Sequence, residues 1–274
     1  MRPLILSLTL AAALPLGAQP ADTIRRSPEP LWDKQDALIA AGFVVGTIAM
    51  FPLDRKVAER LQDTSLQTIR FAHHQATNFR LIGSPGSYFI GATLYAVGRL
   101  ARQKEVADLG LHGTEAILVG EGLTGIIKNL AGRQRPDSGA RGFGGVADPH
   151  DFGFARGFKG DRYRSFPSGH TVAGFAAAAA VVSETHRWWP NSTWYVAPVM
   201  YGGATLIGLS RMYNNRHWAS DVVMGAAIGS FAGRKVVRYH HSHPGNDIDR
   251  ILLGATVVPS ADGGSVIVLT IAPR

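Results

Sequence analysis

The sequence predicts an all-α protein built on a core bundle of six helices, with a short β-hairpin near its C-terminal end. Long apolar segments recur along the 274 residues, and their length and content of Ala, Leu and Met favour helices over strands. Charged residues make up only 18% of the chain, below the roughly 25% typical of soluble domains. This low share favours large buried helices or contact with a membrane.

Residues 1–18 have the pattern of a secretory signal peptide. The chain starts with a short basic stretch, continues with an apolar run and reaches a small residue at Ala18. An uncleaved anchor or a core helix is the alternative, although the run is short for a membrane span. We therefore expect export to the periplasm or to the outer face of the inner membrane. Residues 19–35 are polar and contain proline, which predicts a linker.

The helical domain is expected over residues 36–240. Between its first two apolar segments, residues 54–80 show the spacing of an amphipathic helix. Residues 241–274 form the tail, where two β-branched runs around Asp262 predict the hairpin. The six core helices are predicted at 37–53, 86–101, 113–130, 169–184, 194–211 and 219–237.

Residues 137–166 interrupt the helical pattern with seven glycines and six aromatic residues. A loop of this length in a compact domain is usually a functional lid or disordered. Residues 128–164 carry eight lysines and arginines against four aspartates, half of the net charge of +8. This concentration favours a localised anion site over a diffuse basic surface.

Composition excludes several kinds of chemistry. The chain has no cysteine, which excludes disulfides, thiolate catalysis, iron–sulfur clusters and cysteine zinc sites. The net charge of +8 indicates an anionic partner: nucleic acid, a membrane surface or a phosphorylated substrate.

Two short motifs offer groups that bind anions. Lys128 and Arg135 are seven positions apart, so both face one point if the helix continues for two turns. Ser168 and Gly169 precede the helix predicted at 169–184, where free backbone N–H groups bind anions. Each motif alone also has a structural interpretation, as a solvated helix face or as a turn with a helix cap.

A third motif pairs an imidazole with a carboxylate. His217 and Asp221 share one face if 217–221 is helical, so that Asp221 orients the imidazole. For phosphoryl transfer, His217 is then the better nucleophile, and His170 protonates the leaving oxygen and later activates water. This scheme needs no metal, and the sequence shows no cluster of carboxylates to bind one. A His–Asp pair of this spacing is also commonly structural.

Together and in this order, the motifs resemble the type 2 phosphatidic-acid phosphatase superfamily, which also contains bacterial acid phosphatases and vanadium haloperoxidases. Its signature is K-x6-RP, PSGH and SR-x5-H-x3-D, and all three parts are present here. The resemblance implies an all-α bundle with a nucleophile, an acid–base histidine and a phosphate clamp. The implied roles are catalytic for His217, His170 and Asp221, and phosphate-binding for Lys128, Arg135, Ser168, Gly169 and Arg211.

The resemblance implies a metal-independent phosphatase that acts on phosphomonoesters or lipid (pyro)phosphates through a phosphohistidine, without a cofactor. Vanadate is expected to bind the phosphate site. Two alternatives stay open: a vanadate-dependent haloperoxidase, and a non-enzymatic binder of anionic lipid or nucleic acid. The clustering of charge near the motifs argues against the binder, so no nucleic-acid partner is expected.

The sequence leaves the relation to the membrane open. Charged residues interrupt several of the apolar segments, including Arg99, Glu115 and Glu121. If the signal is cleaved, three spanning segments also place Lys128 in the cytoplasm, on the wrong face for a periplasmic phosphatase. We therefore expect a periplasmic domain associated with the membrane rather than spanning it.

The histidines at 240, 241 and 243 follow the last predicted helix. They have the composition of a chelating tract, but a solvated tail is the preferred interpretation.

Overall fold

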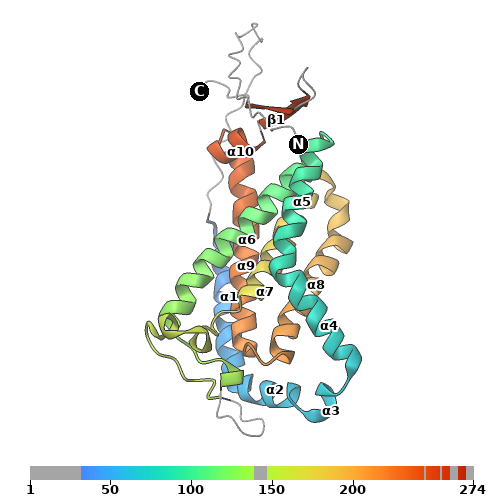
Figure 1. The fold of residues 1–274 in the computed structure, drawn as a ribbon. Coiled ribbons are helices and arrows are strands. Elements are labelled where there is room, and N and C mark those ends of the chain that lie inside the picture. The colour runs from blue at the N-terminus through green and yellow to red at the C-terminus, as the bar shows by residue number, and fades with distance from the viewer. Residues whose placement is uncertain (1–31, 139–146, 244, 254, 260–264, 270–274) are drawn as a thin grey trace.

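The computed structural model describes residues 32–138, 147–243, 245–253, 255–259 and 265–269. It confirms the all-α class: long helices run along one axis and make up the body of the protein (Figure 1). The predicted signal peptide at 1–18 and most of the predicted linker at 19–35 lie outside the described residues. The first described helix begins at Lys34.

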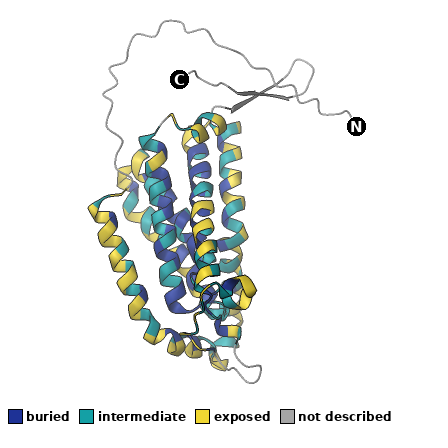
Figure 2. Cartoon of the chain, turned by 90° about the vertical axis from the view of Figure 1, so that its left-hand side faces the viewer, coloured by how far each residue is buried: buried dark blue, intermediate teal, exposed yellow. Residues whose placement is uncertain are grey.

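Each of the six predicted helical ranges coincides with a long helix. Residues between 32 and 243 that the structure describes contain no strand. Buried residues gather in the middle of the bundle, whereas exposed residues cover the outer helices (Figure 2). The long helices are α1 (Lys34–Met50), α5 (Ser87–Leu100), α6 (Lys104–Ala131), α7 (Gly169–Trp188), α8 (Thr193–Tyr213) and α9 (Ala219–Ser242).

Helices α7 and α9 pack in parallel at the centre, and small residues make this possible. α7 buries a run of alanines, among them Ala173, Ala176 and Ala180, which are 0% exposed. A Cβ added at Gly229 of α9 would lie 2.4 Å from the carbonyl oxygen of Val172, closer than any real contact. Helix backbones that approach this closely require residues without side chains. The starts of α7 and α9 are therefore adjacent.

The predicted amphipathic helix at 54–80 is wrong as a single element. It is divided into α2 (Asp54–Leu61), α3 (Thr64–Gln67) and α4 (Arg70–Leu81). Asp63 begins α3 by accepting a hydrogen bond from the backbone N–H of Ser65 at 2.9 Å, as an N-cap does. A π-helical turn, η2 (Ile82–Gly86), then joins α4 to α5.

The stretch predicted at 137–166 lies partly outside the described residues, which omit 139–146. Its described part consists of three short 3₁₀ turns: η3 (Pro136–Ser138), η4 (Arg156–Lys159) and η5 (Asp161–Tyr163). η4 packs on the end of α6, since a Cβ added at Gly157 would lie 2.3 Å from the carbonyl oxygen of Lys128. The loop therefore covers the helix end that carries Lys128.

The tail contains α10 (Asp247–Leu252) and two short strands, β1 (Ala255–Pro259) and β2 (Ser265–Leu269). The strands pair antiparallel, with Ala255 opposite Leu269. Their connection at 260–264 lies outside the described residues, so the predicted hairpin stays a prediction.

Candidate functional site

The three motifs meet at one end of the bundle. Lys128 lies near the end of α6, His170 at the start of α7, Arg211 near the end of α8, and His217 just before α9. Gly132 ends α6 in the left-handed conformation, with φ of +56°, and turns the chain toward Arg135. The two helical turns predicted to join Lys128 to Arg135 are therefore interrupted, although both residues reach the site.

Arg135 is the cation nearest the candidate nucleophile. Its Nη1 lies 3.3 Å from Nε2 of His217 and donates to the carbonyl oxygen of Arg216 at 3.0 Å. Its Nη2 donates to Asp161 Oδ1 at 2.8 Å, and that carboxylate is 62% exposed. Burial, followed by the charge of Arg216, lowers the pKa of Arg135. A guanidinium held this way remains the charged partner for an anion beside His217.

The start of α7 brings three predicted residues together. Ser168 occupies the N-cap position, but its hydroxyl makes no capping bond and instead accepts from Thr171 Oγ1 at 2.8 Å. A Cβ added at Gly169 would lie 3.7 Å from Cε of Lys128, so the lysine reaches the start of the helix. His170 is half-buried and lies within the electrostatic influence of two cations, Arg211 and Lys128.

His217 and Asp221 form the predicted pair. Nδ1 of His217 lies 3.5 Å from Oδ2 of Asp221, and both side chains are buried. Burial, together with the charges of Lys128 and Arg135, holds the pKa of His217 well below its usual value despite the opposing effect of Asp221. The imidazole is therefore neutral near pH 7. Its Nδ1 faces the carboxylate, and Nε2 faces the cations.

Arg211 has hydrogen-bond donors that no described residue uses. The residue is 6% exposed, and its Nε and Nη1 find no acceptor among the described residues. A buried guanidinium with unpaired N–H groups is costly unless an anion pairs with it. The unused donors of Arg211 are therefore suited to an anion.

Sequence reasoning missed Arg133, which lies inside the spacer of the first motif. It is 0% exposed, and its Nη1 donates to Asp221 Oδ1 while Nη2 donates to Asp54 Oδ2 at 2.7 Å. Asp54 also accepts from the backbone N–H of Ser220 at 2.8 Å, which fixes the start of α9. The Arg133 guanidinium further lies within 6.0 Å of the rings of Phe51, Phe152, Phe166 and Trp218.

This network positions Asp221 from several directions. Ser165 Oγ donates to Oδ2 of Asp221, and the backbone N–H of Trp218 donates to the same oxygen at 2.9 Å. The backbone N–H of Ser168 reaches the carbonyl oxygen of Asp221 at 3.0 Å, which ties the start of α7 to that of α9. No feature of the sequence distinguishes Arg133 or Asp54. Inside the spacer of a motif, the sequence pattern of a buried arginine is the same as that of a solvent-exposed one.

The preferred interpretation of the tail histidines is wrong for two of them. His240 is 2% exposed, with Nδ1 2.7 Å from Asp249 and Nε2 2.7 Å from Glu115. His241 contacts the buried carboxylate of Glu184 at 2.9 Å. The sequence shows no carboxylate cluster because these groups are distant in the chain, and the packing of α6, α7 and α9 brings them together.

The fold and the site define a helical bundle in which buried cations lie next to a neutral histidine. The model of the PAP2 superfamily matches residues 111–243, just under half of the chain. The matched residues include all three motifs, so the family resemblance of the sequence is confirmed.

Similar proteins are lipid phosphatases by name. The chain is 41% identical over 91 residues to a lipid A 1-phosphatase of Porphyromonas gingivalis, covering 33% of this chain and 20% of that protein. It is 29% identical over 208 residues to a probable diacylglycerol pyrophosphate phosphatase 1 of Schizosaccharomyces pombe, covering 70% of this chain and 74% of that protein. The chain thus spans about a fifth of the first relative and about three quarters of the second.

Among solved structures, LpxE of Aquifex aeolicus aligns with a TM-score of 0.47 and 22% identity. The alignment covers 68% of this chain and 96% of that one.

Proposed function

We propose that this protein is a metal-independent phosphatase that hydrolyses lipid phosphates through a phosphohistidine intermediate. The observation that carries the proposal is the presence, at one end of the bundle, of a neutral, buried His217 in contact with Arg135 and of a buried Arg211 with unused donors. Nε2 of His217 lies 3.3 Å from Arg135, and Arg211 keeps two unpaired nitrogens. A phosphate placed between them pairs with the free donors and presents its phosphorus to the imidazole.

In the first step, Nε2 of His217 attacks phosphorus while Nδ1–H faces Asp221. The forming imidazolium is stabilised by that carboxylate, which Arg133 and Ser165 hold in place. Lys128, Arg135 and Arg211 spread the charge of the equatorial oxygens, and the N–H groups at the start of α7 add further donors. The negative charge of the bound phosphate stabilises the imidazolium form of His170, which protonates the leaving oxygen as the P–O bond breaks.

In the second step, His170 takes a proton from water, which attacks the phosphohistidine and releases phosphate. The donors around the site are cations, imidazoles and N–H groups, and the one carboxylate beside His217 is already engaged by Arg133. Such a set stabilises oxyanions directly, and the described residues contain no group of metal ligands at this end of the bundle. The proposed mechanism therefore uses no metal.

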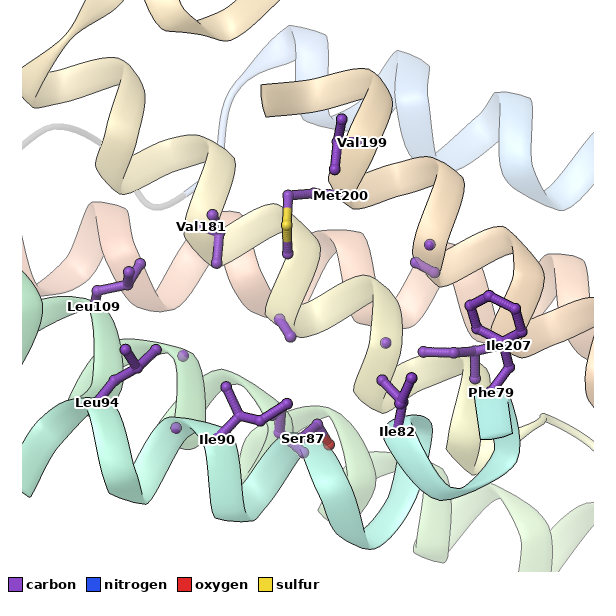
Figure 3. A pocket seen from close by; sticks show the side chains of 17 residues that line it. Phe79, Ile82, Ser87, Ile90, Leu94, Leu109, Val181, Val199, Met200 and Ile207 are labelled. Carbon is purple, nitrogen blue, oxygen red and sulfur yellow. The ribbon is translucent and has the colours of Figure 1, made fainter. Parts of the chain in front are cut away.

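An apolar cavity beside the site supports a lipid substrate. It has a volume of about 190 Å³ and lies between α4, α5, α6, α7 and α8 (Figure 3). Its wall reaches the site, since a Cβ added at Gly83 would lie 2.6 Å from Ile207, which lines the cavity, and 3.6 Å from Cβ of His170. An acyl chain in this cavity leaves its phosphate at His170 and His217. Further lining residues are Phe79, Ile82, Ile90, Leu94 and Val199.

Exposed apolar side chains on the outer helices support a membrane location. They lie on successive helices of the bundle, where one continuous solvent-facing surface of this kind is unfavourable in water. One stretch, Lys34–Leu61, is long and apolar enough to span a membrane by length and composition. Examples are Leu38 (73% exposed), Phe89 (70%), Leu100 (74%), Ile126 (60%) and Val199 (69%).

We further propose that the bundle is embedded with its catalytic end on the periplasmic side, in place of the non-spanning domain and the exported N-terminus expected from the sequence. α1 begins at the far end, where Asp36 pairs with Lys235 of α9, so its start would then lie on the cytoplasmic side. The chain has no cysteine, which permits single-cysteine labelling in intact cells. Lys56→Cys at the catalytic end is expected to react with a membrane-impermeant thiol reagent in intact cells. Ala101→Cys at the far end is expected to react only after the cells are disrupted. The reverse pattern contradicts this orientation.

The activity is tested with p-nitrophenyl phosphate and a short-chain phosphatidic acid. We expect hydrolysis that resists EDTA, is inhibited by vanadate, and is lost in His217→Ala but retained in His73→Ala, an exposed histidine outside the site. Preference for the phosphatidic acid supports the lipid substrate. Halide- and vanadate-dependent peroxidase activity without hydrolysis would contradict the phosphatase, and so would hydrolysis that survives in His217→Ala.

A further inference from the structure

A second group of buried titratable side chains lies at the opposite end of the bundle. It contains His112 of α6, Glu184 of α7 and His241 of α9, whose potential ligand atoms lie within 4.8 Å of one another. His112 lies sixteen residues before Lys128 on the same helix, so about 24 Å separate this group from the catalytic end. The mechanism at the catalytic end uses none of these residues.

The contacts within the group are short hydrogen bonds, and a metal ion bound here would replace the protons that these atoms share. Nδ1 of His112 lies 2.5 Å from Oε1 of Glu184, and Nε2 of His241 lies 2.9 Å from Oε2 of the same carboxylate. His112 is 1% exposed and Glu184 is 0% exposed. Two imidazole nitrogens and a carboxylate that converge from three helices form a donor set that divalent transition metals prefer.

Asp108 lies near this group but outside the set whose ligand atoms lie within 4.8 Å of one another. It lies one helical turn before His112, on the same face of α6. Its carboxylate is within the electrostatic influence of His112, Glu184 and His241. Its Oδ1 is buried and has no hydrogen-bond partner among the described residues. A buried carboxylate oxygen without a partner is unfavourable unless a cation lies next to it. The unpaired oxygen is therefore independent support for a cation at this position.

The second nitrogen of His112 is arranged as in metal-bound histidines. Nε2 lies 3.4 Å from Oδ1 of Asp249, which also accepts from His240. A histidine that binds a metal through one nitrogen commonly donates its other N–H to a carboxylate. A neutral imidazole has a single lone pair, so His112 binds an ion through Nδ1 when Nε2 carries the proton. This arrangement favours Glu184 and His241 over Asp249 and His240 as the ligands that accompany His112.

We propose that His112, Glu184 and His241 bind one divalent transition-metal ion of the Zn²⁺ class and that Asp108 completes the site by a rotation of its side chain. Two carboxylates and two neutral imidazoles then balance the charge of such an ion, and four N and O ligands suit its tetrahedral preference. The ion links α6, α7 and α9 at the end remote from catalysis. It enters past His241, whose side chain is 23% exposed.

The full chain, purified in detergent with a tag free of histidine, is stripped of metal and titrated with Co²⁺ at neutral pH. We expect one Co²⁺ per chain, with the visible absorption of four-coordinate cobalt, displaced by Zn²⁺. His241→Ala and Glu184→Gln are each expected to weaken binding by at least about tenfold. His243→Ala is the matched control, because this neighbouring histidine contacts Tyr239 and Ser242 instead of the group.

Absence of stoichiometric Co²⁺ binding would overturn the proposal and identify the group as a network of protonated histidines and carboxylates. Binding that both ligand variants retain, or that the His243→Ala control loses equally, would overturn it as well. If Glu184→Gln fails to fold, His241→Ala decides, because its side chain is partly exposed. Hydrolysis of p-nitrophenyl phosphate is expected to persist in His241→Ala, so this test is independent of the proposed activity.

Discussion

Arg133 joins Asp221 to Asp54: one guanidinium nitrogen donates to Asp221 Oδ1, and the other donates to Asp54 Oδ2 at 2.7 Å. All three side chains are 0% exposed. The carboxylate that orients His217 is thereby attached to α2, an element outside the three motifs. A buried carboxylate pair with a single arginine between them depends on that arginine for its charge balance.

We therefore expect Arg133→Met to be strongly destabilising. The methionine fills the space among the aromatic rings but leaves two buried carboxylates without a cation, at a cost of about 3–5 kcal/mol. Thermal unfolding in detergent measures the loss. Arg55→Met, at a half-exposed arginine of α2, is the control and is expected to change stability by less than about 0.5 kcal/mol. Equal stability of both variants would contradict the role assigned to Arg133.

Arg211→Met is expected to lower activity without lowering stability. Loss of an oxyanion contact raises the barrier by about 2–4 kcal/mol, which lowers kcat/KM about 10²–10³-fold. The same change removes a buried cation with two unpaired nitrogens, so the protein without substrate is expected to be at least as stable as the wild type. Steady-state kinetics and melting curves of one preparation test both parts. A clear loss of stability would show that Arg211 supports the fold instead of binding an anion.

The low pKa of His217 predicts acid sensitivity of the fold. Below about pH 6.5 the unfolded chain binds a proton that the native imidazole does not, so stability falls as the pH falls. The slope is at most about 1.4 kcal/mol per pH unit for this one group. Melting curves between pH 7.5 and 4.5 should therefore show a weaker pH dependence in His217→Asn than in the wild type. Parallel curves would indicate a histidine with an ordinary pKa.

Ile90→Trp is expected to separate lipid substrates from soluble ones. Ile90 lines the apolar cavity, and an indole there displaces an acyl chain without contacting the phosphate clamp. KM for a long-chain phosphatidic acid should rise, while kcat/KM for p-nitrophenyl phosphate should stay unchanged. Phe89→Trp, at an adjacent exposed position outside the cavity, should affect neither substrate. Equal effects on both substrates would argue against acyl binding in this cavity.

Chelation is expected to affect stability and turnover differently. EDTA should lower the melting temperature by removing the ion proposed at Glu184, because binding to the native state alone stabilises it. The hydrolysis rate at temperatures well below melting should stay the same. Loss of turnover on chelation, restored by Zn²⁺, would instead indicate a metal in the catalytic step.

The sequence predicts the helices and the motif residues well because both depend on local pattern. Long apolar segments specify helices by themselves, and the conjunction of Lys128, His170 and His217 in one order specifies the family. The interruption at Asp63 was not predicted, because capping by an aspartate competes with an amphipathic pattern that continues on both sides.

Partners that are distant in the chain could not be predicted. Asp54 and Arg133 are 79 positions apart and meet only through the packing of α1 and α2 against α9. His112 and Glu184 are 72 positions apart, and neither is near His241 in the sequence. Burial distinguishes these groups from ordinary charged surface residues, and burial is a property of the assembled bundle.

The contact between α7 and α9 also sets a register. Added Cβ atoms at Gly225, Gly229 and Gly233 would all collide with α7, and these glycines recur every four residues. One residue inserted between Asp221 and Gly233 would rotate the helix by about 100° and shift it by about 1.5 Å, so that either the glycines or the carboxylate would lose alignment. Chimeras with related proteins should therefore exchange 168–180 and 219–237 as a single unit.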